Sequence, residues 1–346
     1  MNVNKKVFVF QFHITDMCGN KCLHCYVEGA KRVNINLDIA LGIIDDMKSC
    51  CDNLDMIPML SVTGGDPLLH PSFWTILEKA NSIGAQLGIL GNPELLNEDI
   101  VKRLIATGVK KYQVSLDGMR ETHDRIRSPG SFNRTTAGIK LMSSMGLNVN
   151  VMSTVSDLNY REMIDVMKHS YASGATRWSF ARYTPEIGDC GISSQEYHDF
   201  LQQVIAEHKP YTKMGKIFPM KEALMVPLVS EPKESCGIVG GCALGSSMLC
   251  ILSDASVMPC RRLRESVLGT WKKQGNLLDY FLFHPKMDEY RDIKKIEGCG
   301  SCKFISQCRG CRAAALAATG KITGIDPQCF IQNQVTIKEK GGKKNE

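Results

Sequence analysis

Short apolar runs alternate with helical periods through the first half of this 346-residue chain, and this alternation restricts the folds that it can adopt. Between the runs, apolar residues recur at three- and four-residue spacing, which is typical of amphipathic helices. Strands and helices in alternation predict an α/β fold with a parallel sheet and right-handed crossovers. Six such units are fewer than the eight of a closed barrel, so we expect an open, partial TIM-like (β/α)6 barrel.

The expected elements follow from this pattern. The six expected strands are Val7 to Ile14, Pro58 to Gly64, Gln86 to Asn92, Lys111 to Gly118, Asn148 to Val155 and Thr176 to Tyr183. The five expected helices are Leu37 to Cys51, Ser72 to Ile83, Glu98 to Thr107, Arg134 to Met145 and Arg161 to Ala172.

The alternation stops near residue 190, and from about Cys236 onward the chain is rich in cysteine and poor in regular periods. We therefore expect residues 1–190 to form the barrel and 191–229 to form a linker with one helix. Residues 230–335 are expected to form a small cysteine-rich module, followed by a basic tail over 336–346.

Composition limits the partners and the compartment. The net charge is +6, from 42 basic and 36 acidic residues, and no basic stripe with interleaved aromatic residues is present, which argues against nucleic acid. No apolar run reaches membrane-spanning length and no signal peptide is recognisable, so we expect a cytoplasmic protein without a membrane partner. Disulfides are disfavoured in that compartment. We therefore interpret the clustered cysteines among the fifteen as metal ligands.

Three cysteines stand directly after the first expected strand, where active sites of β/α barrels lie. Cys18, Cys22 and Cys25 have the spacing CxxxCxxC. A structural zinc site and a 4Fe-4S cubane each take four protein ligands, so three thiolates would leave one iron of a cubane open to another ligand. A zinc site and unrelated thiols remain alternatives on spacing alone.

This spacing resembles the CxxxCxφC signature of the radical S-adenosylmethionine (SAM) superfamily, with His24 at the φ position. The resemblance implies a 4Fe-4S cluster held by the three cysteines. It also implies that the amino and carboxylate groups of SAM chelate the open iron.

The stretch TGGDP follows the second expected strand, and its two glycines would let the backbone approach a ligand closely. It is similar to the GGEP stretch that holds the SAM amino group in radical SAM enzymes, which implies that role for Gly64, Gly65 and Asp66. The alternative is a plain turn.

Polar residues also end the third and fourth expected strands. Ser115 and Asp117 lie two residues apart and point to one face of the fourth strand. The surrounding stretch, SLDGMRETHDRIRSPGSF, resembles one whose polar residues help to bind SAM. Arg127 would suit a carboxylate as a bidentate donor, or it is a surface residue on a loop. Asn92 lies in GNPELL, where relatives often read TNG, and it is the candidate ribose contact.

Eight C-terminal cysteines resemble the SPASM domain, the auxiliary-cluster module of many peptide-modifying radical SAM enzymes. The resemblance implies two more 4Fe-4S clusters, three in all, with two interleaved ligand sets. The first set is Cys236, Cys242, Cys260 and Cys311, and the second is Cys299, Cys302, Cys308 and Cys329. Zinc binding and a disulfide framework are the alternatives.

Four cysteines are outside these sets. Cys50, Cys51 and Cys250 are expected to be structural thiols. Cys190 follows the sixth expected strand and is a candidate hydrogen-atom donor, although we expect a bystander.

The resemblance implies a radical SAM/SPASM enzyme that reductively cleaves SAM and abstracts a hydrogen atom to crosslink or oxidise a ribosomally made peptide. The alternatives are a formylglycine-forming oxidase, a peptide epimerase and a non-catalytic iron–sulfur electron carrier. A low-potential electron donor of the flavodoxin or ferredoxin type is an expected partner. Because the first strand begins at about Val7, we expect no leader-binding domain before it, and a separate leader-binding protein is a candidate partner.

Overall fold

The computed structural model describes residues 6–27, 33–217, 221–233, 238, 241–263 and 265–332. Its strands are β1 Val7–Thr15, β2 Ile57–Gly64, β3 Gln86–Leu90, β4 Val109–Ser115, β5 Asn148–Val155, β6 Arg177–Arg182, β7 Met248–Ile251, β8 Ser256–Met258 and β9 Gly269–Thr270. Its α-helices are α1 Leu37–Asn53, α2 Phe73–Ser82, α3 Glu98–Ala106, α4 Arg120–Ile126, α5 Ser131–Ser144, α6 Met163–Ala172, α7 Ser194–Lys213, α8 Val226–Val229, α9 Leu277–Phe283, α10 Pro285–Arg291 and α11 Arg312–Thr319.

The described strands form one nine-stranded sheet in the order β6-β5-β4-β3-β2-β1-β7-β8-β9. Neighbouring strands from β1 to β5 pair in parallel, as the strand–helix alternation predicts. All six expected strands and five expected helices are present, with ends that differ from the expected ones by at most three residues. The short helix α4 was not expected.

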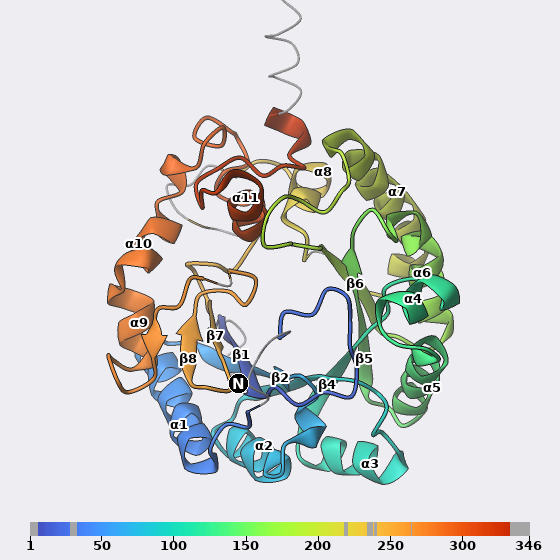
Figure 1. Ribbon diagram of the computed structural model, residues 1–346, viewed down its shortest axis with the longest axis vertical. Helices are drawn as coiled ribbons and strands as arrows, with labels where there is room; N and C mark the ends of the chain where they lie inside the picture. The colour runs from blue at the N-terminus through green and yellow to red at the C-terminus, as the bar shows by residue number, and fades with distance from the viewer. Residues whose placement is uncertain are drawn as a thin grey trace, which may run out of the picture. The chain divides into compact units, whose positions relative to one another are not determined.

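Two compact units are defined by contacts within the chain. Unit 1 comprises Met1–Ser153, Asp165–Trp178 and Ala243–Tyr290, and unit 2 comprises Thr154–Ile164, Ser179–Cys242 and Arg291–Glu346. In unit 1, helices α1, α2, α3 and α5 lie outside the curved run of strands β1 to β5 (Figure 1).

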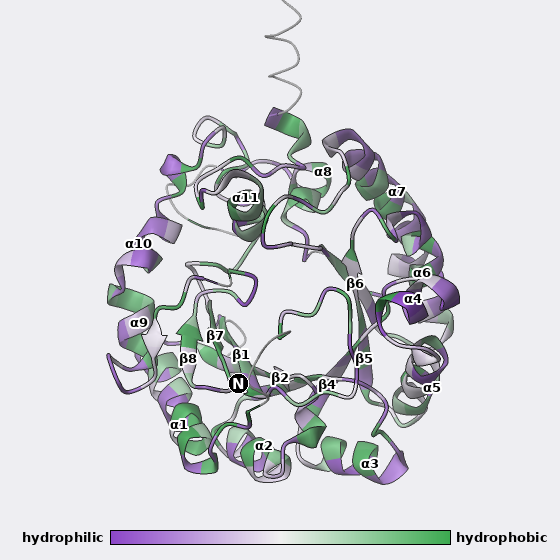
Figure 2. Cartoon of the chain, viewed as in Figure 1, coloured by the Kyte–Doolittle hydropathy of each residue, from purple (hydrophilic) through white to green (hydrophobic). Residues whose placement is uncertain are grey.

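The core of unit 1 lies between the strands and these helices. Phe8, Phe10 and Phe12 on one face of β1 are fully buried, and the ring of Phe8 meets that of Phe281 in α9 edge-on at 4.8 Å. The side chain of Asn36 caps the start of helix α1. The helix buries residues at three- and four-residue spacing, so its ribbon shows both hydrophobic and hydrophilic segments (Figure 2).

Strand β7 extends the sheet beyond β1, although the two strands are far apart in sequence. β7 pairs in parallel with β1, and β8 continues from it in antiparallel orientation. Farther along, the indole Nε1 of Trp271 donates to Asp46 of α1 at 2.8 Å, and the same ring lies where a Cβ on Gly42 would be. These contacts hold residues 243–290 in unit 1.

No α-helix in the described part of the chain has the length and apolar character needed to cross a membrane.

Candidate active site

The three-cysteine loop leaves the carboxyl end of β1 in unit 1. Cys18, Cys22 and Cys25 are all half-buried free thiols. Backbone N–H groups two residues further on donate to Cys18 Sγ and to Cys25 Sγ, each at 3.4 Å. Burial raises the pKa of Cys18 and of Cys22, and the neighbouring thiols add to the effect. The loop therefore brings the three sulfurs within range of one another's charge.

Gly64 and Gly65 let the end of β2 approach this loop. A Cβ on Gly64 would lie 2.0 Å from the carbonyl oxygen of Thr15, and one on Gly65 would lie 2.2 Å from that of Met17. The Gly65 N–H donates to Thr15 at 2.8 Å, and the Asp66 N–H donates to Met17 at 2.7 Å. Only residues without a side chain fit at these two positions, because the obstacle is backbone.

Asp66 is buried beside the same loop. One of its oxygens accepts from the Leu68 N–H at 3.3 Å, and this bond begins a short 3-10 helix, η1 Pro67–Leu69. Burial raises the pKa of Asp66 to about 6. A buried carboxyl of this kind would ionise readily beside an ammonium group, which is the role predicted for it.

Asn92 reaches the loop from the segment after β3. Its side-chain amide donates to Cys18 Sγ at 3.3 Å, and its backbone carbonyl accepts from the Tyr112 hydroxyl at 2.9 Å. The structure therefore brings Asn92 to one of the three loop cysteines. Its predicted contact with the SAM ribose stays a prediction.

Arg127 and Asp117 form a buried ion pair that also touches the loop. The Arg127 Nε donates to Asp117 Oδ2 at 2.5 Å, and its Nη1 donates to Cys22 Sγ at 3.5 Å. His24 Nε2 lies 3.5 Å from the same Asp117 oxygen, and burial lowers the pKa of His24. The Arg127 side chain is only 15% exposed, so the surface-loop alternative is wrong. Ser115, the last residue of β4, lies half-buried two residues before Asp117.

His123 and Asp124 support this ion pair and were given no role from the sequence. The Asp117 N–H donates to His123 Nδ1 at 3.0 Å, while His123 Nε2 lies 3.1 Å from the Ser131 hydroxyl. Burial lowers the pKa of His123 to about 4, so this imidazole is neutral at pH 7. Asp124 accepts from two N–H groups at the start of α5. The only sequence signal for their role was an adjacent His and Asp shortly after the fourth expected strand.

The second predicted set of C-terminal cysteines gathers within unit 2. The pKa of Cys299 is raised to about 11 and that of Cys308 to about 12, mainly by burial, and the charge of Cys329 adds to both. The proximity of Cys302 also contributes to the raised pKa of Cys299 and of Cys329. These four thiols therefore lie close enough to influence one another.

The described residues do not test the first predicted set. Cys236 lies outside them, Cys260 belongs to unit 1, and Cys242 and Cys311 belong to unit 2. Its assignment stays a prediction.

A buried cation lies beside the gathered cysteines of unit 2. Arg312 is 6% exposed, and its charge lowers the pKa of Cys299 against the larger effect of burial. Its Nη1 donates to carbonyl oxygens, but Nε and Nη2 have no partner among the described residues. Unpaired buried donors are costly, and an anionic four-thiolate cluster would offset that cost.

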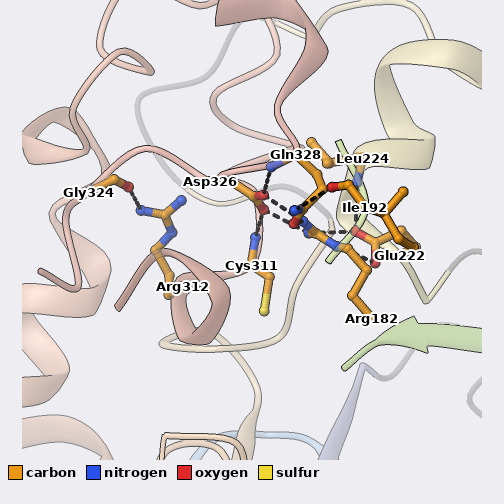
Figure 3. A network of polar contacts seen from close by, with 9 residues as sticks. All are labelled: Arg182, Ile192, Glu222, Leu224, Cys311, Arg312, Gly324, Asp326 and Gln328. Atoms are coloured by element: carbon orange, nitrogen blue, oxygen red, sulfur yellow. Dashed lines mark hydrogen bonds and ion pairs between the residues drawn. The ribbon is translucent and has the colours of Figure 1, made fainter. Parts of the chain in front are cut away.

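A buried network anchors the segment that carries Cys311 (Figure 3). Both terminal nitrogens of Arg182 donate to Asp326, at 2.5 and 2.7 Å, and Nη2 also donates to Glu222 at 3.1 Å. Burial opposes the charge on Arg182, but Asp326 and Glu222 outweigh it and hold its pKa above the ordinary value. Asp326 in turn accepts from the Cys311 N–H at 2.6 Å.

Cys190 lies in the same unit and is 2% exposed. Burial raises its pKa to about 11, which keeps the thiol protonated at pH 7. Its role stays a prediction. Cys50, Cys51 and Cys250 are fully buried, as expected for structural thiols.

The three cysteine sulfurs of the loop each accept an N–H donor. The N–H donors to Cys18, Cys22 and Cys25 would stabilise thiolate charge, so these residues fit a cluster.

Comparison with known proteins agrees with this geometry. The profile of the radical SAM superfamily matches residues 12–169. The chain is 28% identical over 342 residues to an AdoMet-dependent heme synthase of Methanosarcina barkeri, with 93% of this chain and 95% of the synthase covered. It is 31% identical over 321 residues to AlbA, the antilisterial bacteriocin subtilosin biosynthesis protein of Bacillus subtilis, with 87% and 66% covered.

Two solved structures share the fold. Native anSMEcpe with bound AdoMet has a TM-score of 0.74 at 17% identity, with 95% of this chain and 96% of that chain covered. Streptococcus suis SuiB bound to precursor peptide SuiA has a TM-score of 0.72 at 15% identity, with 94% and 76% covered. The sequence-based prediction of the superfamily and of its α/β fold is thereby confirmed. This chain carries a radical SAM domain over residues 12–169 and is an enzyme.

Proposed function

We propose that Cys18, Cys22 and Cys25 hold a 4Fe-4S cluster at which this enzyme cleaves SAM to start hydrogen-atom abstraction from its substrate. The observation that supports this assignment most directly is that side-chain donors from two separate segments reach the cysteine sulfurs. Asn92 donates to Cys18 from the end of β3, and Arg127 donates to Cys22 from beyond β4.

When bound, the cluster and SAM supply a one-electron cleavage of the sulfonium and a carbon-centred radical. The residues of the chain prepare the site for that chemistry. Asn92 and Arg127 stabilise charge on the thiolates, and Asp117 fixes Arg127 in place through a charge-assisted bond. Gly64 and Gly65 provide a backbone surface without side chains beside the cysteine loop.

We assign the SAM amino group to Asp66 and the backbone of Gly64 and Gly65. The burial that raises the pKa of Asp66 to about 6 would be opposed by an ammonium partner, which favours the carboxylate. Ser115, Asp117, Asn92 and His24 complete the proposed pocket.

Two auxiliary clusters belong to the proposal, which makes three in all, within a SPASM module over residues 230–335. The mutual charge effects of Cys299, Cys302, Cys308 and Cys329 support one of them, together with the unpaired donors of Arg312. The set of Cys236, Cys242, Cys260 and Cys311 rests on the sequence resemblance. In this module the clusters would accept an electron from the substrate or hold a substrate thiolate.

For the substrate we propose a ribosomally made peptide, which the enzyme crosslinks or oxidises. The likeness to AlbA, whose name gives its part in bacteriocin biosynthesis, supports this choice. A flavodoxin- or ferredoxin-type donor would supply the electrons, and a separate protein would present the leader.

An iron porphyrin is the second candidate substrate. The observation that favours it is the nearly end-to-end match with the AdoMet-dependent heme synthase, which covers 93% of this chain and 95% of that protein. The two candidates need the same cleavage of SAM and differ only in the molecule that loses hydrogen.

The test uses the anaerobically reconstituted enzyme with SAM and dithionite. We expect 5′-deoxyadenosine to form, and to form faster with a peptide encoded beside the gene than with iron coproporphyrin III. Mass spectrometry of each added compound should show hydrogen loss in the peptide alone. Hydrogen loss in the porphyrin alone would replace the peptide assignment, and the absence of any 5′-deoxyadenosine would refute the proposed reaction.

A further inference from the structure

The face of β1 that points away from the surrounding helices carries a histidine with an unused donor. Phe8, Phe10 and Phe12 occupy the helix-covered face, so His13 shares the opposite, inner face with Gln11. His13 is 5% exposed, and its Nε2 has no hydrogen-bond partner among the described residues. A buried imidazole nitrogen in this state is an exception that calls for an explanation.

Arg261 lies against the same inner face. Its charge lowers the pKa of His13, after the larger effect of burial, and it also lowers the pKa of Cys250 on β7. Cys250 pairs with Gln11 in register, so it faces the same side as His13. Arg261 Nη2 donates to the backbone carbonyl of Tyr26, the residue that follows Cys25. Arg261 therefore contacts the residue that follows the three-cysteine loop, and it is close enough to His13 for its charge to act there.

Arg261 has no acid partner among the described residues, unlike Arg127 and Arg182. Arg127 meets Asp117, and Arg182 meets Asp326 and Glu222. Across the described residues, no carboxylate pairs with Arg261, and its buried Nε has no acceptor. A desolvated guanidinium is costly unless it is paired, and its planar fork matches a carboxylate.

We propose that Arg261 and His13 bind a carboxylate of the substrate on the inner face of β1, beside the cysteine loop. The guanidinium supplies the positive charge and donates one hydrogen bond through Nε. The neutral His13 donates a second hydrogen bond in the tautomer that carries its proton on Nε2. This inference rests on the proposed function and deepens it, because it defines the substrate as a carboxylate-bearing molecule. A peptide with an acidic side chain or a free C-terminus meets this requirement, and so does a porphyrin with propionate groups.

The test measures thermal unfolding of the reconstituted enzyme, with SAM present at saturation, as propionate is added at constant ionic strength. Propionamide, an uncharged analogue of the same shape, and chloride are the reference additives. We expect a saturable rise in the unfolding midpoint of about 2–4 °C when propionate exceeds its Kd about 20-fold, and none with the other two.

Variants then locate the site. In Arg261→Gln the rise should disappear, and in Arg261→Lys and His13→Gln it should shrink. Arg177→Gln is the matched control. Arg177 is a half-buried arginine of unit 1 whose Nε also lacks a partner. It is the first residue of β6, whereas the cysteine loop follows the last residue of β1. The rise should persist in this control.

Four results would overturn the proposal. These are an equal rise with propionamide or chloride, a rise that survives Arg261→Gln, a rise lost in Arg177→Gln, and a rise seen only when SAM is left out. The last would give the site to the carboxylate of SAM itself. The measurement needs no turnover, so a failure here is distinct from a failure of SAM cleavage.

Discussion

Replacement of Gly65 by Ala should disrupt the site through a steric clash with backbone. The new Cβ would lie 2.2 Å from the Met17 carbonyl oxygen and 2.6 Å from its carbon. Ordinary contact begins at 3.4 Å, so the loop must move by about 1 Å. Such a shift would break the bonds from the Gly65 N–H to Thr15 and from the Asp66 N–H to Met17.

Two lost backbone hydrogen bonds cost about 1 kcal/mol each, and overpacking adds about 1–3 kcal/mol. We therefore expect Gly65→Ala to lower the free energy of unfolding by about 3–5 kcal/mol. The assay is urea unfolding of the iron-free chain, followed by iron content and SAM cleavage after reconstitution. Both of the latter should fall sharply, because Cys18 lies one residue beyond Met17.

The control is Gly19→Ala in the same loop. A Cβ there would first meet the Glu94 carboxylate at 3.4 Å, which is ordinary contact, so stability should change by less than about 0.5 kcal/mol. If Gly65→Ala behaves as Gly19→Ala does, the close approach of β2 to the cysteine loop does not exist in solution.

Two further predictions concern charge. Arg182→Met would leave Asp326 and Glu222 buried without their partner, and should cost about 3–5 kcal/mol in urea unfolding, whereas Arg103→Met at an exposed pair should cost less than about 1 kcal/mol. His123 has a folded-state pKa of about 4 against 6.5, so below pH 6.5 the unfolded chain binds a proton that the folded chain refuses. The stability of the wild type relative to His123→Gln should therefore fall by about 1 kcal/mol between pH 6.5 and 5.5, and a constant difference would contradict the buried neutral state.

Much of the fold was predictable because it rests on local periodicity. The ends of β5 coincide with the expected ones, since Asn148–Val155 alternates between exposed or half-buried and buried positions along its length. Helix α4 was missed because Arg120–Ile126 has only seven residues, most of them polar. The pairing of β7 with β1 was also missed, since no local pattern reports contacts between strands more than 200 residues apart.

The site divides in the same way. Cysteine spacing marked the three-cysteine loop, and a resemblance to a known motif marked the glycines, because each signal lies within a short stretch of sequence. The sequence did not indicate that Arg127 reaches both Asp117 and Cys22, which depends on how α4 returns the chain to the loop. It also gave no sign that the charge of Arg261 acts on His13, because the two residues are far apart in sequence.

The most direct test of the central claim is the iron content and SAM cleavage of a variant with Cys18, Cys22 and Cys25 all replaced by Ala. The wild type should hold about twelve irons after anaerobic reconstitution, and the variant about eight. The variant should release no 5′-deoxyadenosine with SAM and dithionite, because no open iron remains to receive SAM. A variant that still cleaves SAM, or a wild type that holds zinc and no iron after anaerobic purification, would contradict the account.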